Sequence, residues 1–296
     1  MKISNYVRVA AAIAVLSFSY SNAEAVQRVR VDITSNAPDG GVALTPVWVG
    51  FHDGSFDSYN GGLSSQEGLE RLAEDGNTSV ISDDFLGGYT YIDNSSGSAV
   101  SARVLSSQAG SERVDGTIAT STGAPPLEPG ETTSALFDID TSGINRYFSY
   151  ASMVLPSNDF YVANGNPTAW DLSSLYDGEG SISFNIGLAN TVNDAGTEVE
   201  SYVTSAANGL FGLAGGQSGP DQGADENGVN MNVLGSDPLS ALNFIEGTPA
   251  AFDFNNTSLY PNGIATITIT AVPEPSSIAL GALGLAGIGL ISRRRR

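Results

Sequence analysis

The chain has 296 residues, contains no cysteine, and carries 32 acidic against 12 basic residues. This length is enough for one large or two ordinary domains. The negative charge excludes nucleic acid as a partner, because a phosphate backbone repels such a surface.

The first 25 residues have the order of a secretory signal peptide. Lys2 and Arg8 precede the apolar run 9–18, and the small-residue sequence Ala23-Glu24-Ala25 follows. This order is typical of a segment removed during export. We therefore assign residues 1–25 to a signal peptide and expect cleavage after Ala25.

The region 26–272 is strongly acidic and has no break in composition, which predicts a single domain. It contains six arginines, no lysine, and every acidic residue of the chain except Glu24 and Glu274, so 30 negative charges oppose six positive ones, a net charge of −24. An exported protein without cysteine is held together by its core or by metal ions, because it has no disulfides.

Alternating apolar and polar residues predict strands over 28–33, 47–52, 181–188 and 266–271. This period of two indicates half-buried strands of an antiparallel sheet. Clusters of turn residues at 36–41, 121–130 and 208–228 indicate loops, and 65–75 is the one good candidate for a helix. We expect an all-β fold, an antiparallel β-sandwich.

Two acidic segments resemble cation-binding loops. The first, 138–143, starts like an EF-hand loop, but its twelfth position is Ser149 where the motif needs glutamate, so we interpret it as a turn. The second contains Asp221, Asp225 and Glu226. It is either a solvated loop or a second, weaker calcium site.

His52 is the only histidine of the chain, and there is no cysteine to assist it. Its place at the end of a predicted strand favours a structural hydrogen-bonding role, so hydrolases that need a histidine base or a zinc site lack the required groups. A glycoside hydrolase needs only two carboxyl groups. With 30 acidic residues, that alternative stays open.

Three blocks of sequence carry a resemblance to a known family. They are LTPVWVGFHDG at the start of 44–75, YFSYASMVLPSNDF over 147–160, and NDAGTE over 193–198. Together they resemble the spondin amino-terminal domain, over roughly residues 26–272. The resemblance implies a β-sandwich similar to calcium-dependent membrane-binding domains. It also implies a calcium ion whose ligands are Asp159, Asp194 and Glu198, where some relatives have aspartate at the last position.

The residues themselves also favour calcium at this place. Calcium prefers six to eight hard oxygen ligands, several of them carboxylates. Asp194 and Glu198 lie four residues apart around Gly196, which lets the backbone curl so that both can face one ion. The alternative is that Asp159 caps a turn and that the other two carboxylates are solvated.

The last 24 residues, 273–296, have three parts. The sequence Pro273-Glu274-Pro275 precedes the uncharged run 276–292, and four arginines follow. As a helix this run would be about 25 Å long, slightly short of a hydrocarbon core of ~30 Å, a deficit that snorkelling arginines can cover. The arginine cluster predicts a cytoplasmic end, so the domain lies outside the inner membrane.

This tail resembles the PEP-CTERM sorting signal of Gram-negative bacteria. The resemblance implies recognition and removal by an exosortase-type membrane protease, and an organism that makes exopolysaccharide or biofilm matrix.

The sequence as a whole predicts an exported calcium-binding structural or adhesive protein of the cell surface or exopolysaccharide matrix, with no catalytic residues. Acidic exopolysaccharide or surface proteins are the expected partners. Two alternatives remain: a secreted carbohydrate-active enzyme, and a passive surface protein without a specific ligand.

Overall fold

A computed structural model gives the fold of the chain. It describes residues 26–87, 113–119, 126–141, 143–175, 178–188, 191–201, 204–205, 208–233, 253 and 256–273. The predicted signal peptide and the tail from Glu274 onward lie outside the described residues. Within these ranges, no helix is both long enough and apolar enough to cross a membrane.

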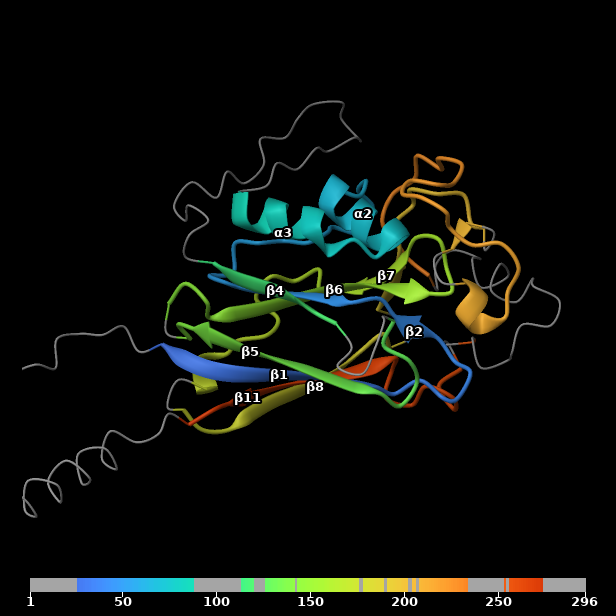
Figure 1. The fold of residues 1–296 in the computed structure, drawn as a ribbon. Coiled ribbons are helices and arrows are strands. Elements are labelled where there is room, and N and C mark those ends of the chain that lie inside the picture. The colour runs from blue at the N-terminus through green and yellow to red at the C-terminus, as the bar shows by residue number, and fades with distance from the viewer. Residues whose placement is uncertain are drawn as a thin grey trace, which may run out of the picture.

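Three layers are stacked in Figure 1: a four-stranded sheet, a larger second sheet, and a pair of helices. The first sheet is antiparallel throughout. Its strands follow the order β5 (Thr132–Ile139), β1 (Gln27–Ser35), β11 (Ala265–Ala271) and β8 (Ser181–Ile186). The chain therefore begins and ends its fold on two neighbouring inner strands.

The second sheet is also antiparallel. Its order is β10 (Met231–Asn232), β9 (Val192–Asp194), β7 (Phe160–Ala163), β6 (Tyr147–Leu155), β3 (Val47–His52) and β4 (Val114–Ile118). The short strand β2 (Ala43–Leu44) pairs with the end of β6. The 3-10 helices η1 (Ser173–Leu175) and η3 (Asn208–Phe211) lie in the connections.

The main core fills the space between the two sheets. Val31 and Ile267 enter it from the first sheet, and Val49 and Phe148 enter it from the second. All four side chains are buried, as the period of two predicts for one face of each strand. The prediction of a mainly β, antiparallel fold is confirmed for the described residues.

Strand β3 departs from the predicted half-buried pattern, because all six of its residues are buried. Helices α2 (Glu67–Asp75) and α3 (Thr78–Gly87) cover the outer face of its sheet. The Trp48 ring packs there against Phe56 and Phe85, with ring centroids 5.4 and 5.2 Å away. A strand between two packed layers has no solvent face.

The sequence predicted one helix over 65–75, and the structure has two in this region. Helix α2 ends where Gly76 adopts a left-handed conformation, and the Gly76 N–H donates to the Leu72 carbonyl at 3.0 Å. Asn77 then caps the start of α3 through its side chain, which accepts the Ser79 N–H at 3.0 Å. Helix α3 buries only Ile81 and Phe85, and this pair is too sparse to give a clear helical period.

The structure around Asp138 and Asp140 agrees with the interpretation of this segment as a turn. Asp138 belongs to β5 and forms a bidentate ion pair with Arg28, with both N···O distances at 2.7 Å. The chain then turns, and the Asn145 N–H donates to the Asp140 carbonyl at 3.1 Å.

Candidate metal site

Asp159 lies in the turn that leads from β6 into β7, and its side chain is fully buried. Its Oδ2 accepts the N–H groups of Thr197 and Glu198, at 3.2 and 3.1 Å. Among the described residues, its Oδ1 has no hydrogen-bond partner. A buried carboxylate oxygen without a donor is costly, so this atom needs a partner that the described part of the chain does not supply.

Asp194 is the last residue of β9 and stands next to Asp159, because its register partner in β7 is Phe160. Its Oδ1 accepts the Gly196 N–H at 2.6 Å. Gly196 has a φ of +64°, and a Cβ there would lie 2.6 Å from the nitrogen of Val229. Glycine is therefore required for the loop to turn and for the segment 221–230 to approach.

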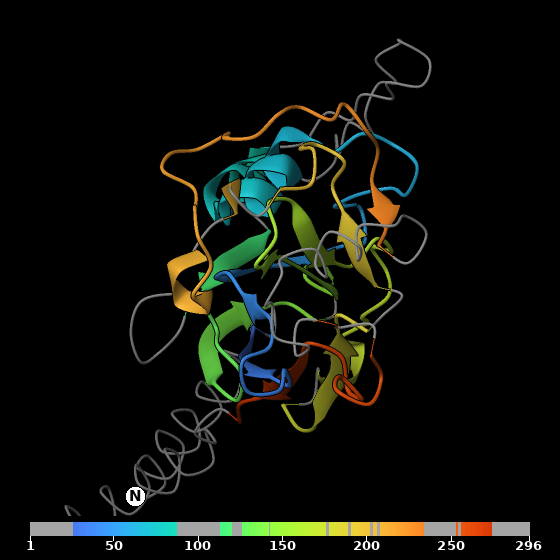
Figure 2. The ribbon, with the colours of Figure 1, turned by 90° about the vertical axis from the view of Figure 1, so that its right-hand side faces the viewer.

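Glu226 completes a group of three carboxylates. One carboxylate oxygen from each of Asp159, Asp194 and Glu226 lies within 4.8 Å of the other two. Backbone hydrogen bonds bring Glu226 to this place, since its N–H donates to the Thr197 carbonyl at 2.9 Å and the Gly228 N–H donates to the Gly196 carbonyl at 2.7 Å. Figure 2 shows the segment that carries Glu226 arching over the helices from η3 to β10.

A fourth carboxylate, that of Glu200, borders the group. It is in hydrogen-bonding contact with Asp194 and interacts electrostatically with Glu226. Four carboxylates from three segments thus meet at one end of the second sheet.

The acidity of these groups reflects burial and mutual repulsion. Burial raises the pKa of Asp159, Asp194 and Glu200 to about 7 each. The charge of Asp159 adds to the rise at Asp194, while the N–H donors of Thr197 and Glu198 act in the opposite direction on Asp159. Burial also raises the pKa of Glu226. Such a cluster favours protons or a cation, because like charges at this distance disfavour full ionisation.

The structure places Glu198 differently from Asp159 and Asp194. Its backbone N–H binds Asp159, but its carboxylate is not one of the three grouped around that residue. The side chain instead accepts a hydrogen bond from Asn158 and faces Arg71, Asp75 and Asp221. The structure therefore groups the carboxylate of Glu226, and not that of Glu198, with those of Asp159 and Asp194.

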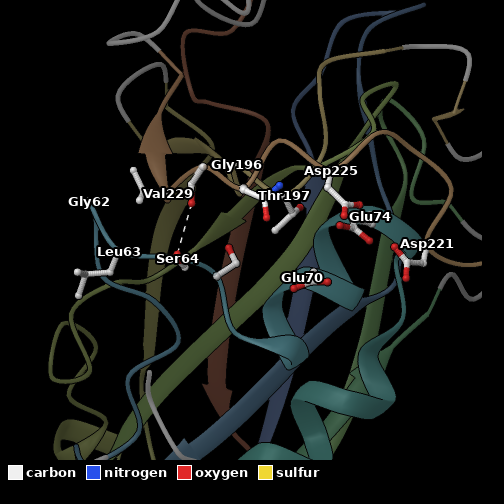
Figure 3. Close-up of a pocket in the computed structure, with 13 residues that line it drawn as sticks. Gly62, Leu63, Ser64, Glu70, Glu74, Gly196, Thr197, Asp221, Asp225 and Val229 are labelled. Atoms are coloured by element: carbon white, nitrogen blue, oxygen red, sulfur yellow. Dashed lines mark hydrogen bonds between the residues drawn. The ribbon is translucent and has the colours of Figure 1, made fainter. Parts of the chain in front are cut away.

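Asp221 and Asp225, predicted together with Glu226 as a second site, line a neighbouring pocket of about 470 Å³. Figure 3 shows them beside Glu74 at one end of this pocket, while Leu63 and Val229 lie at the other end. The Arg71 guanidinium supplies a positive charge here, with N···O distances of 2.6 Å to Glu74, 3.3 Å to Asp75 and 3.5 Å to Asp221. Glu74 and Asp221 of this pocket therefore already have a cationic partner.

His52 lies far from these carboxylates in the fold, at the end of β3, and is fully buried. One ring nitrogen contacts the Ser149 hydroxyl at 2.8 Å, and the other accepts the Gly54 N–H at 3.0 Å. Burial, followed by the charge of Arg113, lowers its pKa to about 3. The imidazole is thus neutral and occupied by hydrogen bonds inside the protein.

At the other end of the chain, the last strand leads directly into the predicted sorting motif. The Val272 N–H donates to the Arg28 carbonyl at 2.8 Å, and Pro273, the next residue, is exposed. A comparison with known families matches residues 271–296 to the PEP-CTERM protein-sorting motif. The tail of this chain is a PEP-CTERM motif.

The PEP-CTERM motif implies export, a membrane-anchored precursor and processing by an exosortase on the way to the cell surface. No curated protein matches the chain. The spondin resemblance of the preceding domain has no support from these comparisons. Glu274, Pro275 and the predicted membrane-spanning run lie outside the described residues.

Proposed function

We propose that Asp159, Asp194, Glu226 and Glu200 bind a calcium ion. The observation that carries this proposal is the buried Oδ1 of Asp159, which has no hydrogen-bond donor and belongs to a group of carboxylates within 4.8 Å of one another. Hard oxygen ligands without nitrogen or sulfur favour calcium or magnesium, and several carboxylates on flexible loops favour calcium. Backbone carbonyls and water would complete the shell.

Calcium in this position would join three parts of the chain. Asp159 comes from the β6–β7 turn, Asp194 and Glu200 come from the loop after β9, and Glu226 comes from the segment 221–230. In the cation-free protein these parts repel one another, because each carries negative charge. A bound divalent ion replaces this repulsion by attraction and therefore rigidifies one end of the domain.

We further propose that the domain is a non-catalytic structural or adhesive module of the spondin type at the cell surface or in the exopolysaccharide matrix. The export signal, the acidic surface and the absence of lysine from 26–272 are consistent with a protein that binds cations and acidic polysaccharide through them. The three spondin-like blocks lie side by side in the structure. Strand β3 of the first block pairs with β6 of the second, and Ser65 Oγ of the first block donates to the Ala195 carbonyl of the third at 3.0 Å.

A matched pair of variants tests the ligand set. Thermal unfolding of the full-length protein in detergent is followed during a calcium titration, with magnesium as the comparison ion. An ion at a hundredfold excess over its dissociation constant stabilises the folded state by about 2.7 kcal/mol. Glu226→Gln should lose much of this shift, whereas Glu198→Gln should keep it.

An unchanged unfolding temperature of the wild-type protein at millimolar calcium would refute calcium binding. A shift that is lost in Glu198→Gln but kept in Glu226→Gln would refute the ligand assignment and restore the set expected from sequence.

A further inference from the structure

The PEP-CTERM motif begins where the folded domain ends. The Ala271 N–H donates to the Gly180 carbonyl at 3.1 Å, and the Val272 carbonyl accepts the Gln27 side-chain amide at 3.2 Å. Pro273 follows without an intervening linker. We call this end of the sandwich, marked by Gln27, the turn 178–180 and Ala271, the exit end.

The carboxylate cluster lies at the opposite end. Strand β6 starts beside the exit end, because β5 ends at Ile139 opposite Gln27 and the chain then turns into β6. It runs nine residues to Leu155, and Asp159 follows in the next turn. At about 3.3 Å per residue the two ends are about 27 Å apart. In Figure 1 the blue start of β1 and the red end of β11 lie on one side, and the orange loops lie on the other.

The distance between the exit end and the membrane is short. Pro273, Glu274 and Pro275 are the residues between Val272 and the apolar run that starts at 276. Three residues span at most about 10 Å, and two prolines make them stiff. The exit end of an anchored precursor must therefore lie close to the lipid headgroups.

The distribution of charge favours one orientation of the domain relative to the membrane. At the exit end, Arg28 is paired with Asp138 and Arg146 is paired with Asp171, and Glu179 adds one exposed negative charge. At the opposite end, four carboxylates and the acidic pocket have Arg71 as their described positive charge. A domain lying on its side would bring these acids near anionic lipid, whereas an upright one keeps them several Debye lengths of about 8 Å away.

We propose that the exit end is the face that meets the lipid surface in the anchored precursor, and that the carboxylate cluster is presented outward at the far end of the domain. The upright position follows from the linkerless junction and from the charge distribution. It rests on the sorting motif and does not depend on calcium binding. The candidate cation site in this position faces away from the membrane.

The chain has no cysteine, so single probes can be introduced cleanly. Glu179→Cys places a probe at the exit end, and Glu128→Cys places one in the turn before β5 at the opposite end; both residues are exposed glutamates. The full-length precursor with a fluorophore on each cysteine is inserted in vesicles of phosphatidylcholine and phosphatidylglycerol that contain a headgroup nitroxide quencher.

We expect quenching several-fold stronger at position 179 than at position 128. Equal quenching, or stronger quenching at 128, would overturn the proposal. A long Gly-Ser insertion between Val272 and Pro273 should reduce the difference, because it frees the domain to tumble. A difference that survives this insertion unchanged would show that the junction does not set the orientation.

Discussion

Replacing Asp194 by asparagine distinguishes a cation ligand from an ordinary hydrogen-bonded aspartate. Asparagine has nearly the same shape and keeps an oxygen that can accept the Gly196 N–H. It removes one negative charge from the neighbourhood of Asp159 and Glu200. If Asp194 only serves the turn, the variant is at best as stable as the wild type. If it is a ligand, the cation-free variant is more stable than the wild type.

The magnitude follows from the pKa. Burial and the charge of Asp159 raise the pKa of Asp194 from 3.8 to about 7. Since each pKa unit corresponds to about 1.4 kcal/mol, ionising this group in the folded protein costs up to about 4 kcal/mol above neutral pH. The neighbouring acids titrate together with it, so we expect a gain of about 1–2 kcal/mol from its removal. At about 2–4 °C per kcal/mol for a domain of this size, the unfolding temperature rises by several degrees.

The assay is thermal unfolding of the full-length protein at neutral pH, followed by circular dichroism in chelator and in calcium. We expect the wild-type protein to gain about 5–10 °C from saturating calcium, from about 2.7 kcal/mol at a hundredfold excess. The Asp194→Asn variant should start higher in chelator and gain little. A variant that starts lower than the wild type and still responds fully to calcium would refute the reasoning.

Three further outcomes follow from the described contacts. In chelator, the wild-type protein should lose stability as the pH rises from about 4 to 7. Over this interval the folded state keeps protons on Asp159, Asp194 and Glu200 that the unfolded chain releases. A melting temperature that rises with pH here would contradict the raised pKa values. Phe85→Ala should lower the free energy of unfolding, measured with urea, by about 3–5 kcal/mol, because it leaves a cavity between α3 and the sheet. A loss below 1 kcal/mol would show that the packing of α3 contributes little to stability. Arg71→Met should lower the free energy of unfolding by about 3 kcal/mol at neutral pH, because it leaves the carboxylate of Glu74 buried without its cation. The loss should be smaller at about pH 5, where Glu74 is protonated. Equal losses at both pH values would argue against this ion pair.

Three strands of the first sheet, β1, β8 and β11, were predictable because one of their faces is solvated. In β1 and β11 every second residue is buried, so the alternation is visible in the sequence. Strand β3 was also predicted, over 47–52, but its burial on both faces was not, because the helices that cover its second face come from 67–87 and contact it only in the folded chain. Helix α3 itself owes its stability to Phe85 and Ile81, and packing rather than periodicity identifies it.

The candidate site was predictable in part. Asp159 and Asp194 were expected from the resemblance of their sequence blocks, and the pairing of β7 with β9 brings them together in the structure. Glu226 reaches them through backbone hydrogen bonds to Gly196 and Thr197, which no local pattern encodes. Glu198 was the natural choice by spacing. The turn at Gly196, with its φ of +64°, directs the Glu198 side chain toward Arg71.

The junction between β11 and the sorting motif also restricts where the exosortase can cut. A protease holds its substrate as an extended segment with free backbone groups. In β11 these groups are already bonded on both edges, to β1 and to β8, up to Ala271, and the Val272 N–H is bonded as well. While the sheet is intact, the scissile bond must therefore lie after Val272. We expect the mature protein to retain all of β11 and Val272, so that the first two residues of the matched motif, Ala271 and Val272, stay at its carboxyl terminus.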